Sequence, residues 1–239
     1  MTLSSSRTHR VVRSFVRRST RMNDSQRRAW DRYADTFVIP VPTGDHSTSI
    51  STDANLDWAR VFGREAPLAV EIGSGAGESL VAMAQRRPER DIVAFEVFAP
   101  AVASTLSRIG RAGVKNVRIV VADGTEGLER LCVPGGVAEL WTFFADPWHK
   151  ARHHKRRLVS GWFADLAASR LSPGGLWRLA TDWEDYACWQ RALLDGHPLF
   201  TNVHGGWAPR PDDRPVTKYE RRGLDAGRRV FDLEYRRNA

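Results

Sequence analysis

The feature that most constrains the fold of this chain is a series of short apolar segments that alternate with helical segments. A short apolar run bounded by turn residues is typical of a buried strand. We expect strands at residues 67–72, 91–97, 117–121, 137–144 and 176–180. Helical patterns lie between them, for example at residues 80–84 and up to Leu106. The alternation predicts an α/β fold with a doubly wound, mostly parallel sheet that is covered by helices on both faces.

One acidic residue lies at or directly after the end of each expected strand. These residues are Glu71, Glu96, Asp123, Asp146 and Asp182. Parallel strands end at the same edge of a sheet, and open α/β sheets bind their ligands at that edge. Any one of the acids can instead cap the helix that follows it, but capping is a poor explanation for all five. The pattern therefore predicts a ligand site at this edge.

The first expected strand leads into a cluster of three glycines, Gly73, Gly75 and Gly77. Glycines permit a tight turn and a close approach of the backbone to a ligand. A dinucleotide fingerprint would have glycine where Glu78 stands, and a pyrophosphate would meet the carboxylates of Glu71 and Glu78. S-adenosylmethionine carries an ammonium and a sulfonium group and no phosphate, so that nearby acids attract it. The loop therefore favours S-adenosylmethionine over NAD.

The acids after the next two strands fit the same cofactor. We expect Glu96 to accept hydrogen bonds from both ribose hydroxyls and Asp123 to pair with the adenine amino group. The glycine loop together with these acids favours a Rossmann-like, class I methyltransferase.

The segment that follows the fourth expected strand combines an acid, a proline, an aromatic residue and a run of cations. Residues 149–157 contain five Lys or Arg, three His and no acid. An acid can bind the Watson–Crick edge of guanine, an aromatic ring can stack on a base, and cations can hold phosphates. This combination suits an RNA substrate. His149 and His153 have a spacing seen in zinc sites, but Lys150 replaces the glutamate of a metalloprotease and no third ligand is evident, so we expect no metal.

The charge of the chain also favours a polyanionic partner. The net charge is +8, and the sequence between residues 7 and 35 holds nine Arg against three Asp. A general bias toward arginine is the alternative explanation, but clustering is what phosphate binding requires. Residues 1–53 lack sustained apolar periodicity, and we interpret them as a basic, flexible N-terminal arm that precedes a methyltransferase domain at 54–239.

The N-terminal residues also bear on location. Residues 1–20 are polar and carry arginines, without the apolar core or cleavage site of a secretory signal. No apolar run is long enough to span a bilayer. We therefore expect a cytoplasmic protein without a membrane partner, and nothing in the sequence indicates an obligate protein partner.

Four segments together resemble one known family. The run at 146–157, with the segments 13–18, 181–183 and 214–220, resembles the bacterial tRNA (guanine-N7)-methyltransferase family, and the likeness extends over almost the whole chain after about residue 12. The resemblance implies that a methyl group passes from S-adenosylmethionine to N7 of the variable-loop guanine, position 46, of tRNA. The chain departs from the family at Ala145, where proline is usual, at Phe98, where a polar residue is usual, and at Tyr219, which replaces a frequent phenylalanine.

The resemblance and the residue chemistry together assign the site. We expect the cofactor to contact Glu71, Gly73, Gly75, Gly77, Glu96, Asp123 and Asp146. We expect the substrate to contact Lys150, Arg152, Lys155, Arg156, Arg157, Asp182, Thr217, Lys218, Tyr219 and Glu220.

Guanine N7 carries a lone pair and no proton, so the reaction needs alignment rather than a general base. We assign the central catalytic role to Asp146, as an electrostatic partner of the base or the cofactor. Asp182 and Glu220 are candidates to accept from guanine N1–H and N2–H₂, whereas Lys150 and Lys218 can donate to O6 or to phosphate. The sequence leaves open how these contacts are divided. A non-catalytic RNA-binding protein and a methyltransferase acting on rRNA are the alternatives.

Overall fold

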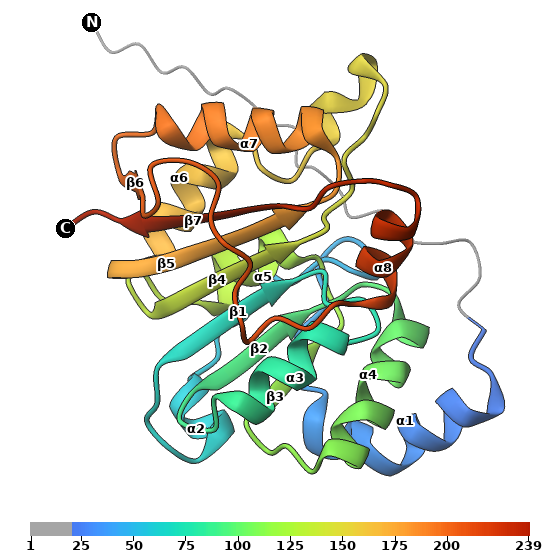
Figure 1. Ribbon diagram of the computed structural model, residues 1–239. Coiled ribbons are helices and arrows are strands. Elements are labelled where there is room, and N and C mark those ends of the chain that lie inside the picture. The colour runs from blue at the N-terminus through green and yellow to red at the C-terminus, as the bar shows by residue number, and fades with distance from the viewer. Residues whose placement is uncertain (1–20) are drawn as a thin grey trace, which may run out of the picture.

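The structure is a computed structural model, and it describes residues 21–239. In this part of the chain seven strands form one sheet in the order β3-β2-β1-β4-β5-β7-β6 (Figure 1). Five strands are parallel: β1 (Leu68–Ile72), β2 (Asp91–Phe95), β3 (Val117–Val120), β4 (Val137–Phe143) and β5 (Leu171–Thr181). Strand β7 (Phe231–Arg237) runs antiparallel to both β5 and β6 (Phe200–Asn202). The order reverses between β1 and β4, which makes the end of these two strands the switch point of the sheet.

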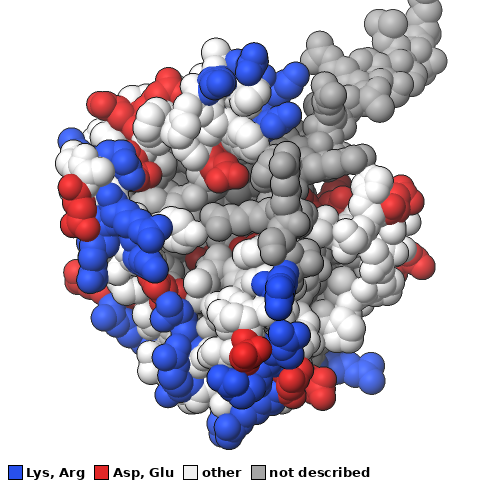
Figure 2. Space-filling model, turned by 90° about the vertical axis from the view of Figure 1, so that its right-hand side faces the viewer, with Lys and Arg blue, Asp and Glu red and all other residues white. Residues whose placement is uncertain are grey.

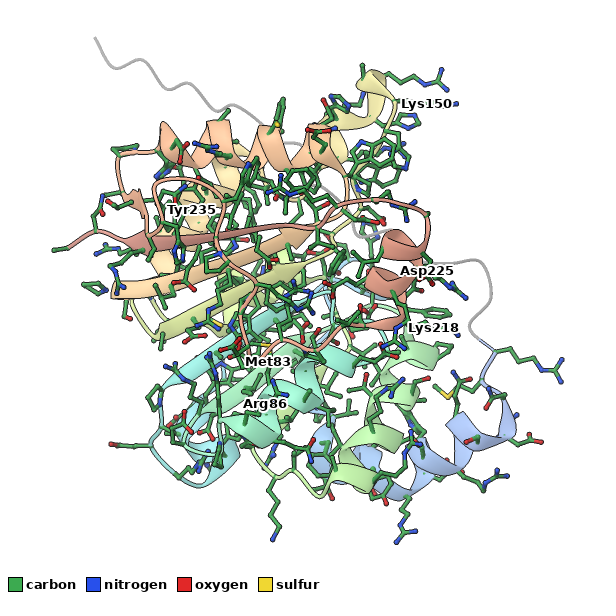
Figure 3. All side chains as sticks on the ribbon, viewed as in Figure 1. Met83, Arg86, Lys150, Lys218, Asp225 and Tyr235 are labelled. Carbon is green, nitrogen blue, oxygen red and sulfur yellow. The ribbon has the colours of Figure 1, made fainter. Side chains whose placement is uncertain are left out.

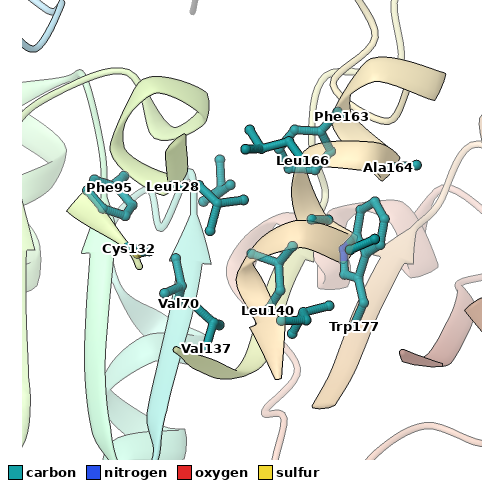
Figure 4. Close-up of a cluster of buried hydrophobic side chains, with 14 of the residues drawn as sticks. Val70, Phe95, Leu128, Cys132, Val137, Leu140, Phe163, Ala164, Leu166 and Trp177 are labelled. Carbon is teal, nitrogen blue, oxygen red and sulfur yellow. The ribbon is translucent and has the colours of Figure 1, made fainter. Parts of the chain in front are cut away.

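Helices cover both faces of this sheet. The helices of residues 21–239 are α1 (Asp24–Phe37), α2 (Trp58–Phe62), α3 (Glu78–Arg86), α4 (Ala99–Ala112), α5 (Gly124–Leu131), the 3₁₀ helix η1 (Ala151–Arg156), α6 (Gly161–Arg170), α7 (Glu184–Asp195) and α8 (Lys218–Asp225), of which α8 lies at the carboxyl edge of the sheet. One apolar cluster joins the sheet to α3 and α4, and another joins its opposite face to α5 and α6. The second cluster is drawn in Figure 4, where Leu128 of α5 and Phe163 of α6 face Val70, Leu140 and Trp177.

The sequence of β1 explains why the sheet is covered on both sides. Successive side chains of a strand point to opposite faces, and here Ala69 belongs to one apolar cluster while Val70 belongs to the other. All five residues of β1 are buried. A strand that is buried at every position can be accommodated only between two layers of helices, so the doubly wound fold that we expected is confirmed.

The structure contains two strands that the apolar pattern did not lead us to expect. Strands β6 and β7 extend the sheet beyond β5, and β5 itself begins at Leu171 rather than near residue 176. In β7 the apolar residues Phe231, Leu233 and Tyr235 are buried and alternate with polar ones. This period of two was available in the sequence and is typical of a strand.

The structure corrects our interpretation of residues 21–53 as part of a flexible arm. Helix α1 begins with a capping box in which Asn23 and Gln26 exchange side-chain to backbone hydrogen bonds. The Gln26 side chain also donates to the carbonyl of Pro100 in α4, at 2.8 Å. Farther along, Ile39 N donates to the carbonyl of Ile119 in β3, and Ile50 is fully buried. The described part of the N-terminal region therefore belongs to the domain, while residues 1–20, including the family-like segment 13–18, lie outside the described residues.

Candidate cofactor and RNA site

The carboxyl ends of the five parallel strands lie at one edge of the sheet, on the right in Figure 1, next to α8. Figure 2 looks onto this edge, and groups of Lys and Arg side chains are visible at the top, the left and the bottom of that face. The loop after β1 and the loop after β4 meet here because β1 and β4 are neighbours in the sheet. The predicted site residues on these loops are therefore brought together.

The glycine loop after β1 has the backbone that only glycine adopts readily. Gly73, Gly75 and Gly77 have φ angles of 76°, 54° and 75°, in the left-handed region. At Gly77 a Cβ atom would also lie 2.5 Å from the Thr105 side chain of α4. The loop thus turns tightly, with Gly73 exposed and Gly77 buried against α4.

Two polar side-chain atoms beside this loop are buried without a hydrogen-bond partner among residues 21–239. They are Glu71 Oε2 and Ser74 Oγ. Burial, together with the nearby charge of Glu96, raises the pKa of Glu71 to about 8. Buried polar groups in folded proteins nearly always have a hydrogen-bond partner. A cationic group bound here would pair with Glu71 and favour its ionised form, so the residues fit the charged groups of S-adenosylmethionine.

Glu96, at the end of β2, shapes the same loop. One carboxylate oxygen accepts a hydrogen bond from Gly75 N at 2.8 Å, and the other accepts from Phe98 N at 2.9 Å. A carboxylate oxygen has two lone pairs, so each oxygen retains capacity for one more donor. The geometry is therefore compatible with the expected acceptance from two ribose hydroxyls, and it adds a structural role that the sequence did not reveal.

Asp123, after β3, is the acid for which capping explains the observed contacts. Its Oδ1 atom accepts from Thr125 N at 2.8 Å, from Glu126 N at 3.2 Å and from Thr125 Oγ1 at 2.5 Å. The residue is 4% exposed. Asp123 therefore begins α5 as its N-cap, and its contact with adenine stays a prediction.

Asp146 lies in an unusual loop after β4. Phe144 and Trp148, which flank it, have positive φ angles of 53° and 47° although neither is glycine. Such backbone strain persists only where the surroundings enforce it, and it clusters at functional sites. Here the Phe144 N–H donates to Ala180 O at 2.7 Å, and the Pro147 carbonyl accepts from Arg157 Nε at 3.0 Å. The loop holds Asp146 exposed at the edge of the sheet.

The cations that follow Asp146 divide into two kinds. Lys150 and three residues of η1 are exposed, namely Arg152, Lys155 and Arg156, and Figure 3 shows Lys150 projecting from the upper right of the molecule. Arg157 is instead 1% exposed. Its guanidinium pairs with Asp185 and lies over the rings of Tyr186 and Trp189. This burial corrects our expectation of a substrate contact, because Arg157 supports the loop through Pro147 and does not face solvent.

Helix α8 carries the predicted substrate segment, but its four residues differ in access. Thr217 is the N-cap and accepts from Glu220 N, while Lys218 and Tyr219 are exposed. Glu220 is fully buried and pairs with Arg210 and Arg214. We therefore correct its predicted role as an acceptor for guanine: Glu220 fixes the helix from inside.

Asp182, after β5, is half-buried and accepts a hydrogen bond from Arg228 Nε at 2.7 Å. It also packs against α8, because a Cβ atom at Gly223 would lie 2.6 Å from Asp182 Oδ2. Next to Asp182 in the sequence, Trp183 contacts His149, and the centroids of their rings are 3.9 Å apart. Sequence reasoning missed a second set of exposed cations around α8, which the Arg pairs of the sequence could have indicated: Arg221, Arg222, Arg228 and Arg229.

Neither a membrane span nor a metal cluster is found among residues 21–239. No helix in this range has the length and the apolar character that a bilayer span requires. Within the same range, no three His, Cys, Asp or Glu side chains are grouped so that they could hold a metal ion.

Comparison with solved structures agrees with the class that the fold and the loop define. A 16S rRNA methyltransferase, KamB, matches with a TM-score of 0.52 at 18% identity over 84% of this chain and all of the other. The 16S rRNA (adenine(1408)-N(1))-methyltransferase from Catenulisporales acidiphilia gives a TM-score of 0.52 at 16% identity, over 84% of this chain and 99% of that one. The seven-stranded sheet with its glycine loop therefore has the fold of these methyltransferases.

The relatives in sequence define the family more narrowly. Residues 65–233 match the family model described as "Putative methyltransferase". A tRNA (guanine-N(7)-)-methyltransferase of Cutibacterium acnes is 53% identical over 237 residues, covering 98% of this chain and 86% of the relative. Its counterpart from a Nocardioides species is 50% identical, covering 95% of this chain and 88% of the relative. The chain belongs to the tRNA (guanine-N7)-methyltransferase family.

Proposed function

We propose that this protein methylates N7 of the variable-loop guanine at position 46 of tRNA, in the cytoplasm, with S-adenosylmethionine as methyl donor. The observation that carries the proposal is the position of Asp146 at the switch point between β1 and β4. On one side lies the glycine loop with the buried acid Glu71. On the other side lie the exposed cations of η1 and α8. Cofactor chemistry and RNA binding thus meet at one exposed carboxylate.

The residues around the glycine loop suit the methyl donor. When bound, S-adenosylmethionine supplies an activated methyl group on a sulfonium centre. In our proposal Glu71 and Ser74 offer their unpaired oxygens to its polar groups, and Glu96 offers its remaining lone pairs to the ribose. Gly73 and Gly75 leave room for the cofactor, since a Cβ atom added at either position would have no neighbouring atom within 4 Å.

The acceptor needs alignment and charge compensation rather than proton removal. Guanine N7 has an in-plane lone pair and no hydrogen, and the base becomes positive as it is methylated. The carboxylate of Asp146 can orient the base and offset this charge in a fixed position, which is how preorganised groups lower a barrier. The strained backbone at Phe144 and Trp148 supports this assignment, because it keeps the carboxylate in one place.

The remaining contacts with RNA fall to exposed residues. Lys150 and Lys218 can donate to guanine O6 or to phosphate, Asp182 can accept from the guanine edge, and Tyr219, which is 57% exposed, can stack on a base. The η1 cations Arg152, Lys155 and Arg156 are suited to phosphates, because they are exposed and close together in the chain.

The test is a methylation assay followed by nucleoside analysis. Purified protein is incubated with labelled S-adenosylmethionine and tRNA that lacks modifications, and the product is digested and mapped by mass spectrometry. We expect 7-methylguanosine at position 46 and no label in a tRNA in which that guanine is replaced by adenine. Label in 16S rRNA but not in tRNA would assign a different acceptor. Binding of tRNA without any transfer would indicate a non-catalytic RNA-binding protein.

A further inference from the structure

One carboxylate joins the cofactor side of the site to the substrate side. Glu78 is the first residue of α3 and follows directly on the glycine loop. Its Oε2 atom accepts a hydrogen bond from Lys218 N, at 2.5 Å, and Lys218 is the first residue of α8. Its Oε1 atom accepts from Arg108 Nη2 at 2.8 Å. Glu78, which stands where a dinucleotide fingerprint would have glycine, thus holds the start of α8.

Helix α4 connects Glu78 to the carbonyl groups of the glycine loop. Arg108, in α4, also donates from Nε to the carbonyl of Ala76 at 2.9 Å. A turn earlier in α4, Thr105 Oγ1 lies 3.2 Å from the carbonyl of Gly75 and can donate to it. The loop, Arg108, Glu78 and Lys218 therefore form one continuous chain of hydrogen bonds. This chain of contacts joins the glycine loop to the first turn of α8.

The segment that precedes α8 is attached to the other end of α3 as well. Arg86 donates to the carbonyl of Asp212, and Arg87 pairs with Asp213. Between the two attachments, Val216 borders an open groove of about 460 Å³ and is 39% exposed. Figure 3 labels Arg86, in α3, and Lys218, at the start of α8, and shows them well apart. Residues 212–218 are thus held at both ends of α3, and between these contacts by the buried Arg214, which pairs with Glu220 and Asp232.

The charge and the partial burial of Glu78 strengthen its contacts with Arg108 and Lys218. The side chains of Glu78 and Arg108 are 25% and 35% exposed, so bulk water screens the pair less than a fully exposed one. A hydrogen bond from a backbone N–H to a carboxylate is charge-assisted and stronger than one between neutral groups. At Lys218 it also satisfies one of the N–H groups that a helix start leaves unpaired.

We propose that Glu78 is a positioning residue that couples cofactor binding to tRNA binding. The inference rests on the function proposed above. A bound cofactor restricts the glycine loop and with it Glu78, which then holds Thr217, Lys218 and Tyr219 in the place where RNA meets them. The tRNA that binds second finds this segment already ordered and loses less conformational entropy. Because such coupling is reciprocal, tRNA strengthens cofactor binding by the same factor.

The experiment measures this coupling directly. The Kd of unmodified tRNA is determined with and without saturating S-adenosylhomocysteine, for the full-length wild type and for variants. We expect the wild-type ratio of the two Kd values to be about fivefold or more, and Glu78→Ala to bring it close to one. Glu78→Gln keeps an oxygen for Lys218 N and should fall between the two. Arg108→Met, which releases the loop carbonyl instead, should also lower the ratio.

Glu89→Gln is the matched control, because Glu89 follows α3, is 64% exposed and pairs with the adjacent Arg90. It should keep the wild-type ratio. The melting temperature of every variant shows whether it folds, and Arg108→Met provides an independent test if Glu78→Ala does not. A wild-type ratio near one, an unchanged ratio in Glu78→Ala, or equal loss in Glu78→Gln and Glu78→Ala would overturn the inference. A wild type that does not methylate tRNA guanine would instead refute the proposed function.

Discussion

Two groups of acidic side chains are buried in this protein, and they differ in what faces them. Glu139, within β4, accepts from Arg87 at 2.8 Å and from Trp141 Nε1 at 2.9 Å, and it lies 3.2 Å from Arg90. Glu71, at the end of the neighbouring β1, has an oxygen without any hydrogen-bond partner among residues 21–239. The two residues are 2% and 3% exposed. Burial therefore does not separate them, whereas the presence of arginine partners does.

The same division extends to other acids. Asp232 and Glu220 share the buried Arg214, which also lies over the rings of Phe143 and Phe144. Asp146 is exposed at the edge of the sheet, with no ion pair to residues 21–239. An acid that is matched by arginines is stable where it is, while an unmatched acid is available to a ligand. Among the buried acids, pairing with arginine thus separates Glu139, Glu220 and Asp232 from Glu71.

The largest effect is expected at Asp146. Asp146→Asn keeps the size of the side chain but removes the charge that offsets the positive guanine. The loss of such a preorganised group lowers the rate by about a hundred- to a thousand-fold. Single-turnover methylation of unmodified tRNA at saturating cofactor measures it, with Asp45→Asn, an exposed acid outside the site, as the control. If Asp146→Asn reacts at nearly the wild-type rate, the unmatched carboxylate is not central and Asp182 becomes the candidate.

The Lys and Arg side chains after β4 allow the same comparison between exposed and buried charges. Replacing the exposed Arg152, Lys155 and Arg156 by Ala should reduce the slope of log affinity for tRNA against log salt, by about one unit for every phosphate that these side chains neutralise in the wild type. Arg157→Met should leave this slope unchanged and lower the free energy of unfolding by about 0.5–3 kcal/mol, because it removes the contacts of the buried guanidinium with the Pro147 carbonyl and with the rings of Tyr186 and Trp189. A salt slope that falls equally in both variants would show that burial does not separate these residues.

A dependence of stability on pH tests the burial of the unpaired Glu71. The pKa of Glu71 rises from 4.5 to about 8 on folding. Between these values the unfolded chain has lost the proton that the folded chain retains, so the contribution of Glu71 to stability decreases as pH rises through this window. We therefore expect the free energy of unfolding of the ligand-free wild type, measured in urea, to fall more steeply from pH 5 to pH 8 than that of Glu71→Gln. The difference in slope should be about 1.4 kcal/mol per pH unit at most. Parallel pH profiles would contradict the burial of an unpaired Glu71.

The strands of the central sheet could be predicted from the sequence because each is a short apolar run between turn residues. Helix α1 was missed, although Asn23 and Gln26 form a capping box and Trp30, Tyr33 and Phe37 have helical spacing. Its mean composition is polar, and packing against α4 and β3 makes it part of the domain. Local pattern predicts an element, but it does not show which surface that element will meet.

The site could be predicted by residue type but not by partner. Arg156 and Arg157 are adjacent and identical in the sequence, yet one is exposed and the other is 1% exposed. Glu220 falls in a family-like segment, and only the folded chain brings Arg210 and Arg214 to it. The coupling contact between Glu78 and Lys218 joins residues 140 positions apart. Such contacts depend on tertiary structure, which spacing along the chain does not encode.

The most direct test of the division between matched and unmatched acids compares Glu71→Gln with Glu139→Gln in one experiment. The free energy of unfolding is measured by urea titration, and the affinity for S-adenosylmethionine by calorimetry. We predict that Glu71→Gln lowers the affinity for S-adenosylmethionine by about tenfold or more and leaves the free energy of unfolding unchanged. Glu139→Gln should lower the free energy of unfolding by about 3 kcal/mol and leave cofactor affinity unchanged. A destabilised Glu71→Gln that binds the cofactor normally, or a stable Glu139→Gln that does not bind it, would contradict the account.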